Sequence, residues 1–132
     1  MTEPIESILD GTKKAVGLGA EYDVYDADIL MHINSVFFTL NQLGVGPAAG
    51  YAISGPEETW SSYLGDDPNL AAVRSYTFLR VRMLFDPPPH SFTQQAMFDQ
   101  IKEYEWRLNV YAENTYADSS AGSPSEIDGG VI

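Results

Sequence analysis

The chain has 132 residues and no cysteine. It contains 19 acidic and 7 basic side chains, which gives a formal net charge of −12. One domain of this size buries about two thirds of its extended-chain surface, so a hydrophobic core is expected. The composition excludes disulfides, cysteine nucleophiles and cysteine-based metal sites, and so acidic a surface repels nucleic acid and anionic membranes.

The N-terminal segment contains acidic residues and no apolar run of the signal-peptide kind. No stretch reaches the ~20 apolar residues that a membrane span needs. We therefore expect a soluble protein. The first helix is predicted at residues 4–16, where Pro4 suits the first turn and Gly17 ends the pattern.

The clearest amphipathic helix is predicted at residues 27–43. Its apolar side chains recur at steps of three and four: Ile29, Ile33, Val36, Leu40 and Leu43. Asp26 is placed to cap this helix, and Gly44 is placed to end it in the left-handed conformation.

A glycine-rich loop follows at residues 44–56, and loops of this length in compact domains often carry function. We expect Tyr51 and Ile53 to hold the loop against the core. Ser54 and Glu57 have the spacing of a capping box, which predicts a short helix that ends at Gly65.

The next helix is predicted to begin with a cap at Asp66 or Asp67 and to run to about Phe85. Three of the seven basic residues lie on it: Arg74, Arg80 and Arg82. The prolines at residues 87–89 must end it, because proline cannot donate a backbone hydrogen bond.

Ser91 and Gln94 have the spacing of a second capping box, behind which a helix of about 20 residues is predicted. Its apolar stripe consists of Met97, Ile101, Tyr104, Leu108 and Tyr111. Glu103 and Arg107 are spaced as an i,i+4 ion pair. From about Thr115 the sequence becomes rich in Ser, Gly, Pro and Asp, and such a segment does not order itself alone.

These elements predict an all-α fold, with a small bundle of four or five helices in residues 1–114 and an extended C-terminal arm in residues 115–132. Eight apolar side chains are expected in one core: Leu30, Ile33, Phe37, Leu40, Val73, Leu84, Ile101 and Leu108. No stretch has the sustained alternation of a β-strand, and there is no internal repeat.

Nothing in the sequence forms an active site, so we expect a protein that is not an enzyme and has no cofactor or metal. His32 and Asp28 can meet on one helix face, but two ligands do not make a metal site. The acidic pairs at residues 57–58 and 66–67 lack the supporting context of glycosidase carboxylates. The glycines at residues 44–46 do not precede the Lys-Ser/Thr pair of a phosphate-binding loop.

Three segments together resemble a known family: HINSVFFTLNQLGVGP (residues 32–47), RSYTFLRVRMLFDPPP (74–89) and QQAMFDQIKEYEWRLNV (94–110). They are similar to the head–tail connector, or adaptor, proteins of long-tailed bacteriophages of the HK97 type. The resemblance covers about residues 5–113. It consists of a helix, a glycine loop, an arginine-rich helix, the FDPP junction and a long helix.

The resemblance implies a structural virion protein, made in the bacterial cytoplasm and located in the neck of the particle. Such proteins form a homo-oligomeric ring, commonly of about twelve copies, beneath the portal protein. The ring extends the DNA channel and offers a docking surface for the stopper or tail. DNA passes through it without specific binding, and no membrane is involved.

Three groups of residues are assigned to surfaces of such a ring. Subunits are expected to pack through complementary charges at Arg74, Arg80, Arg82, Glu103 and Glu105, with pairing inside one chain as an equal alternative. The channel or its rim is expected to contain Glu57, Glu58, Asp66 and Asp67, whose charges repel DNA phosphates. The tail is expected to dock on the portal through Ile127, Val131 and Ile132.

Two other functions fit parts of the sequence. An acidic DNA mimic that inhibits a nucleic-acid-binding enzyme explains the net charge equally well, but it does not explain the FDPPP junction. A small hydrolase needs a cluster of ionisable residues that the sequence does not show. A closed ring of many copies would favour the connector, whereas a monomer that binds a nuclease would favour the mimic.

Overall fold

Five helices follow one another in the computed structural model, which describes the backbone of residues 6–121 and the side chains of residues 6–114. They are α1 (Ile8–Ala15), α2 (Asp26–Gln42), α3 (Trp60–Leu64), α4 (Leu70–Phe85) and α5 (Ser91–Ala121). Within this part of the chain no β-strand forms, and only an isolated bridge joins Ser7 to Thr59. The predicted all-α bundle is confirmed.

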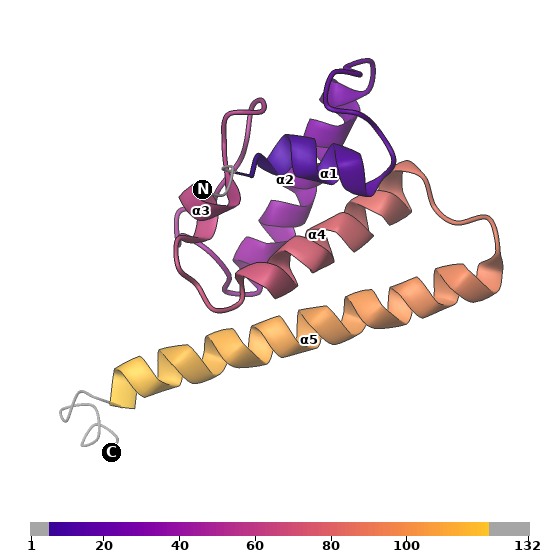
Figure 1. Ribbon diagram of the computed structural model, residues 1–132. Coiled ribbons are helices and arrows are strands. Elements are labelled where there is room, and N and C mark those ends of the chain that lie inside the picture. Colours follow the sequence, from indigo (N-terminus) through magenta and orange to yellow (C-terminus); the bar gives the residue numbers. More distant parts are fainter. Residues whose placement is uncertain (1–5, 122–132) are drawn as a thin grey trace, which may run out of the picture.

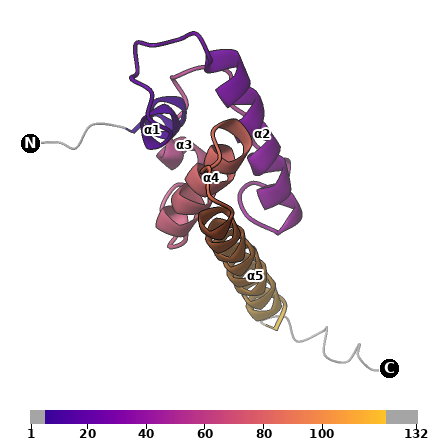
Figure 2. The same ribbon diagram turned by 90° about the vertical axis from the view of Figure 1, so that its right-hand side faces the viewer.

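Helix α4 lies at the centre of the bundle and contacts each of the other four helices. Helix α5 runs antiparallel to it on one side, and α1 and α2 cover the other side (Figure 1). Figure 2 shows α4 enclosed by the remaining helices. Accordingly, Val73, Tyr76 and Val81 of α4 are completely buried.

Seven of the eight predicted core residues lie in this core or pack against it: Leu30, Ile33, Phe37, Leu40, Val73, Ile101 and Leu108. The prediction for Leu84 is wrong, because that side chain is 48% exposed. Leu84 lies in the last turn of α4, where residues 86–90 lead the chain away before α5 begins (Figure 1). It therefore lines an open groove with Phe98 and Lys102.

Helix α5 is longer than predicted. It contains 31 residues, which corresponds to about 46 Å, whereas the 16 residues of α4 span about 24 Å. The C-terminal part of α5 therefore extends beyond the bundle (Figure 1). The change in composition near Thr115 does not end the helix, which continues to Ala121. Residues 122–132, which include Ile127, Val131 and Ile132, lie outside the described residues.

The start of α3 also differs from the prediction. The capping box is formed by Thr59 and Ser62, each of which bonds the backbone N–H of the other at 3.0–3.1 Å. Ser54 instead contacts Glu58, whose carboxylate accepts bonds from the Ser54 amide (3.0 Å) and hydroxyl (3.2 Å). The predicted box at Ser54 and Glu57 does not form. The contact between Ser54 and Glu58 takes its place, and the box of Thr59 and Ser62 follows it.

Other predicted caps are also replaced. Asp26 is the first residue of α2 rather than its cap. Asn69 precedes α4 without a side-chain cap, and Asp67 accepts a bond from the Asn69 amide at 2.7 Å. At α5 the Gln94 side chain donates to the carbonyl of Pro88 (2.6 Å), which fixes the proline junction to the first turn of the helix.

An ion pair formed by a buried lysine connects α1 to α2. The Lys13 side chain is only 1% exposed, and its Nζ lies 2.8 Å from Asp26 Oδ1. The same ammonium donates a hydrogen bond to the carbonyl of Ala20 (2.8 Å). The Asp26 side chain is 32% exposed, so the pair joins a buried ammonium to a carboxylate that still reaches solvent.

Candidate functional site

Two asparagines of α2 hold the loop between α2 and α3 on the bundle. Asn34 bonds both backbone groups of Ile53: its Oδ1 accepts from the amide (2.8 Å) and its Nδ2 donates to the carbonyl (2.9 Å). Asn41 Nδ2 donates to the carbonyl of Pro47 (3.1 Å). Neither asparagine is predicted from the sequence as a functional residue, although their spacing of seven places them on one face of the helix.

The predicted role of Tyr51 and Ile53 is confirmed. Ile53 is buried in the core. Tyr51 stacks on Tyr63, with ring centroids 4.7 Å apart, and its hydroxyl bonds that of Ser62 at 2.7 Å. The loop is therefore attached to both α2 and α3.

A pocket of about 400 Å³ opens beside this loop, and we refer to it as the loop pocket. Its walls include Val45, Gly46, Tyr63, Asp67, Leu108 and Ala112. Gly44 and Gly46 have φ values of +91° and +87°. A Cβ atom on Gly44 would lie 2.9 Å from Ala112 Cβ, and one on Gly46 would lie 2.8 Å from Tyr63 Cε1. The close approach of the loop to α3 and α5 therefore requires glycine at both positions.

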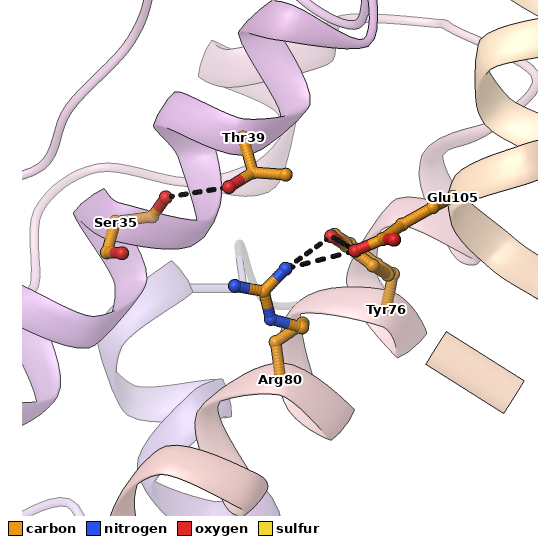
Figure 3. Close-up of polar contacts among 5 residues, drawn as sticks. All are labelled: Ser35, Thr39, Tyr76, Arg80 and Glu105. Carbon is orange, nitrogen blue, oxygen red and sulfur yellow. Dashed lines mark hydrogen bonds and ion pairs between the residues drawn. The ribbon is translucent and has the colours of Figure 1, made fainter. Parts of the chain in front are cut away.

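A second polar site joins α4 to α5. The Tyr76 hydroxyl donates to Glu105 Oε2 (2.7 Å), and Arg80 Nη1 donates to the same oxygen (3.1 Å) and to the tyrosine hydroxyl (2.8 Å). Figure 3 shows the three side chains converging between the helices; Thr39 in the same view donates to Ser35 within α2. Burial, and then the hydrogen bond to Glu105, raise the pKa of Tyr76 above its usual range, so the phenol remains a neutral donor.

Replacing Glu105 by Gln is expected to lower the free energy of unfolding by about 1–2 kcal/mol, because Arg80 loses its countercharge in a partly buried site. Glu103→Gln is the matched control, since Glu103 pairs with Arg107 on the exposed face (2.6 Å) and such pairs contribute about 0.3–0.5 kcal/mol. Urea unfolding measures both variants. Equal destabilisation by the two variants would contradict the structural importance of the Tyr76–Arg80–Glu105 group.

All five residues predicted for subunit packing have partners within the chain. Arg80 pairs with Glu105, as described above. Arg74 Nη1 lies 2.7 Å from Glu6 Oε1, and Arg82 Nε donates to the carbonyl of Asp86 (2.8 Å). Glu103 bonds Arg107. Pairing inside one chain therefore occurs, and a role of these residues between subunits stays a prediction.

The four acidic residues predicted for the channel flank α3 in the sequence: two precede the helix and two follow it. Glu57 and Asp66 are exposed, whereas Glu58 and Asp67 are partly buried. Slight burial acts to raise the pKa of Glu58, but hydrogen bonds from the Ser54 and Gly55 backbone, its own amide and the Ser54 hydroxyl outweigh it, so the pKa is lowered. Glu57 and Asp66 are therefore the two that offer free carboxylates to solvent.

The described residues contain no group of three or more His, Asp or Glu side chains placed to hold a metal ion. Among the helices of the same part of the chain, none is long and apolar enough to cross a membrane.

Among known proteins, the chain matches the model of one family. No curated protein and no solved structure matches the chain. Residues 8–115 match the family described as phage connector protein, and this region spans all of α1 to α4 and most of α5. The match extends over far more than half of the chain, so the protein belongs to the phage connector family.

Proposed function

We propose that the protein is a head–tail connector, or adaptor, subunit of a long-tailed bacteriophage of the HK97 type. In this role it forms a ring beneath the portal, extends the DNA channel and provides the docking surface for the stopper or tail. The observation that carries the proposal is the family match over residues 8–115, because connector families are structural rather than enzymatic. The site of action is then the neck of the virion.

The distribution of apolar side chains supports assembly. Large apolar residues are exposed on α2 and α5: Met31, Phe38, Phe92, Phe98 and Trp106. Exposed side chains of this size can pack against another subunit. A face on α2 and a different face on α5 allow a heterologous contact, in which each subunit uses one face for each neighbour. Such a contact forms a closed ring when the rotation between neighbouring subunits divides a full turn.

The partners at the two ends of the ring are the portal and the stopper or tail. We assign portal docking to the C-terminal arm, with Ile127, Val131 and Ile132 as its apolar anchors. The long helix α5 supports this assignment, because its C-terminal part extends beyond the bundle (Figure 1). The arm then starts from a part of the subunit that the other helices do not cover (Figure 1).

In this function the acidic surface near α3 faces the channel and keeps DNA from adhering to its wall. The double variant Glu57→Lys/Asp66→Lys is therefore expected to bind DNA as a ring, with about tenfold higher affinity than wild type at ~50 mM salt and with the gain lost by ~200 mM. Fluorescence anisotropy with short duplex DNA measures the affinity.

Glu21→Lys/Asp23→Lys is the matched control, because it makes the same change in net charge at two exposed positions before α2. Equal DNA binding by both double variants would mean that only net charge matters, and it would remove the basis for placing α3 at the channel.

A further inference from the structure

The loop pocket contains a buried hydroxyl group without a partner. Tyr63 is 4% exposed, and no described residue lies within hydrogen-bond geometry of its hydroxyl. The ring cannot easily turn away, because it packs on Phe37 and Tyr51 with centroid distances of 4.4 and 4.7 Å and lies against Gly46. Burial, and then the charge of nearby Asp67, raise the pKa of Tyr63 above its usual range, so the group stays neutral. A buried hydroxyl without a partner is costly, so a hydrogen bond to it from another chain would be favourable.

The chemistry of the pocket defines what it accepts. Val45, Leu108 and Ala112 provide apolar walls, while Tyr63 and Asp67 also line the pocket and carry oxygen atoms that can accept hydrogen bonds. A suitable occupant therefore combines a large apolar side chain with N–H donors beside it and carries no negative charge.

The first turn of α5 has these properties. Phe92 is 86% exposed, the highest value among the large apolar side chains that the structure describes. Helix N-termini present free backbone N–H groups and a positive dipole end, and no acidic residue in this first turn offsets them. The dipole end beside Phe92 is therefore the electrostatic complement of the Asp67 carboxylate.

A subunit cannot fill its own pocket with this side chain. Phe92 and Leu108 are separated by 16 residues of the same helix, which corresponds to about 24 Å. A Phe92 side chain that enters the pocket must therefore belong to a second copy of the chain, with Phe92 on one subunit and the pocket on the next.

We infer that the subunits of the proposed ring join head to tail, with Phe92 and the first turn of α5 of one subunit inserted into the loop pocket of its neighbour. The Tyr63 hydroxyl oxygen then accepts a backbone N–H of that turn, and Asp67 neutralises the dipole end. This inference rests on the proposed ring and names its contact. It assigns Asp67 to the junction between subunits, while Glu57, Glu58 and Asp66 remain at the channel.

Cross-linking of the full chain tests the contact, and the absence of native cysteine makes the result unambiguous. The double variant Ser91→Cys/Asn69→Cys places one thiol beside Phe92 and one at the pocket, where the Asn69 side chain makes no capping bond. The two thiols lie at opposite ends of α4, about 24 Å apart, so a short bismaleimide cannot join them within one subunit. We expect a ladder of covalent multimers from the double variant and covalent dimers alone from a mixture of the two single variants.

Adding Phe92→Ser to the double variant is expected to reduce the ladder at least tenfold, whereas Val24→Ser, at an exposed apolar residue before α2, leaves it unchanged. Tyr63→Phe, which removes only the hydroxyl, should reduce it about threefold to tenfold. Circular dichroism confirms that each variant remains folded. No ladder, or a ladder unaffected by Phe92→Ser, overturns the inference.

The particle mass of the wild-type chain is measured in parallel. A wild-type ring without the cross-link rejects this contact and keeps the proposed function, whereas a wild type that stays monomeric even with portal-bearing heads rejects both.

Discussion

Ile33→Ala is expected to lower the free energy of unfolding by about 2–5 kcal/mol, because it removes a completely buried side chain and leaves a cavity. Ile33 belongs to α2, which packs on the central helix α4, so neighbouring side chains cannot close the gap without moving two helices. Urea unfolding followed by circular dichroism measures the loss. The variant should unfold in a single transition at a lower midpoint, with an unchanged slope.

Leu84→Ala is the informative control. Sequence periodicity places Leu84 in the same core as Ile33, whereas the structure leaves it 48% exposed. We therefore expect a loss below about 1 kcal/mol for Leu84→Ala, in line with the smaller area removed from water. Equal losses at both positions would mean that α5 covers the end of α4, contrary to the observed path of residues 86–90.

Asp26→Asn is expected to have the second large effect, about 3 kcal/mol of destabilisation, because it leaves the ammonium of Lys13 buried without a countercharge. The hydrogen bond from Lys13 to the Ala20 carbonyl remains, but a neutral carbonyl does not replace a carboxylate. Thermal unfolding at neutral pH compares this variant with the wild type.

Asp28→Asn provides the matched control, since both aspartates lie in the first turn of α2 and interact similarly with its dipole, and Asp28 is exposed. We expect that control to cost about 0.5 kcal/mol. The double variant Lys13→Met/Asp26→Asn should recover much of the stability, because it replaces the ion pair by neutral groups. A double variant no more stable than Asp26→Asn would show that the charge of Lys13 is not the cause.

The features predicted correctly from the sequence are those set by local pattern. The stripe of α2 identifies Ile33 and Leu40 as core residues, because their spacing matches the period of a helix. Gly44 ends this helix with a φ of +91°, and Val45 packs back on the core, as the glycine predicts. The prolines end α4 because they lack the donor that a continuing helix requires.

The features that were missed depend on contacts between distant segments. Nothing local distinguishes Lys13 from an exposed lysine, because its partner Asp26 belongs to another helix. The capping box of α3 lies at Thr59 rather than Ser54, since backbone bonds between residues 6–8 and 58–60 fix where that helix starts. The loop pocket was not predicted either, because its walls come from residues 44–47, α3 and α5.

The mass of the assembled particle tests the central proposal most directly. Native mass spectrometry of the full chain, alone and with portal-bearing heads, should detect a closed ring whose mass is a whole multiple of the 14.5 kDa subunit, with about twelve copies. A chain that remains monomeric in both conditions, or that forms a one-to-one complex with a nuclease, would contradict the assignment as a ring-forming connector.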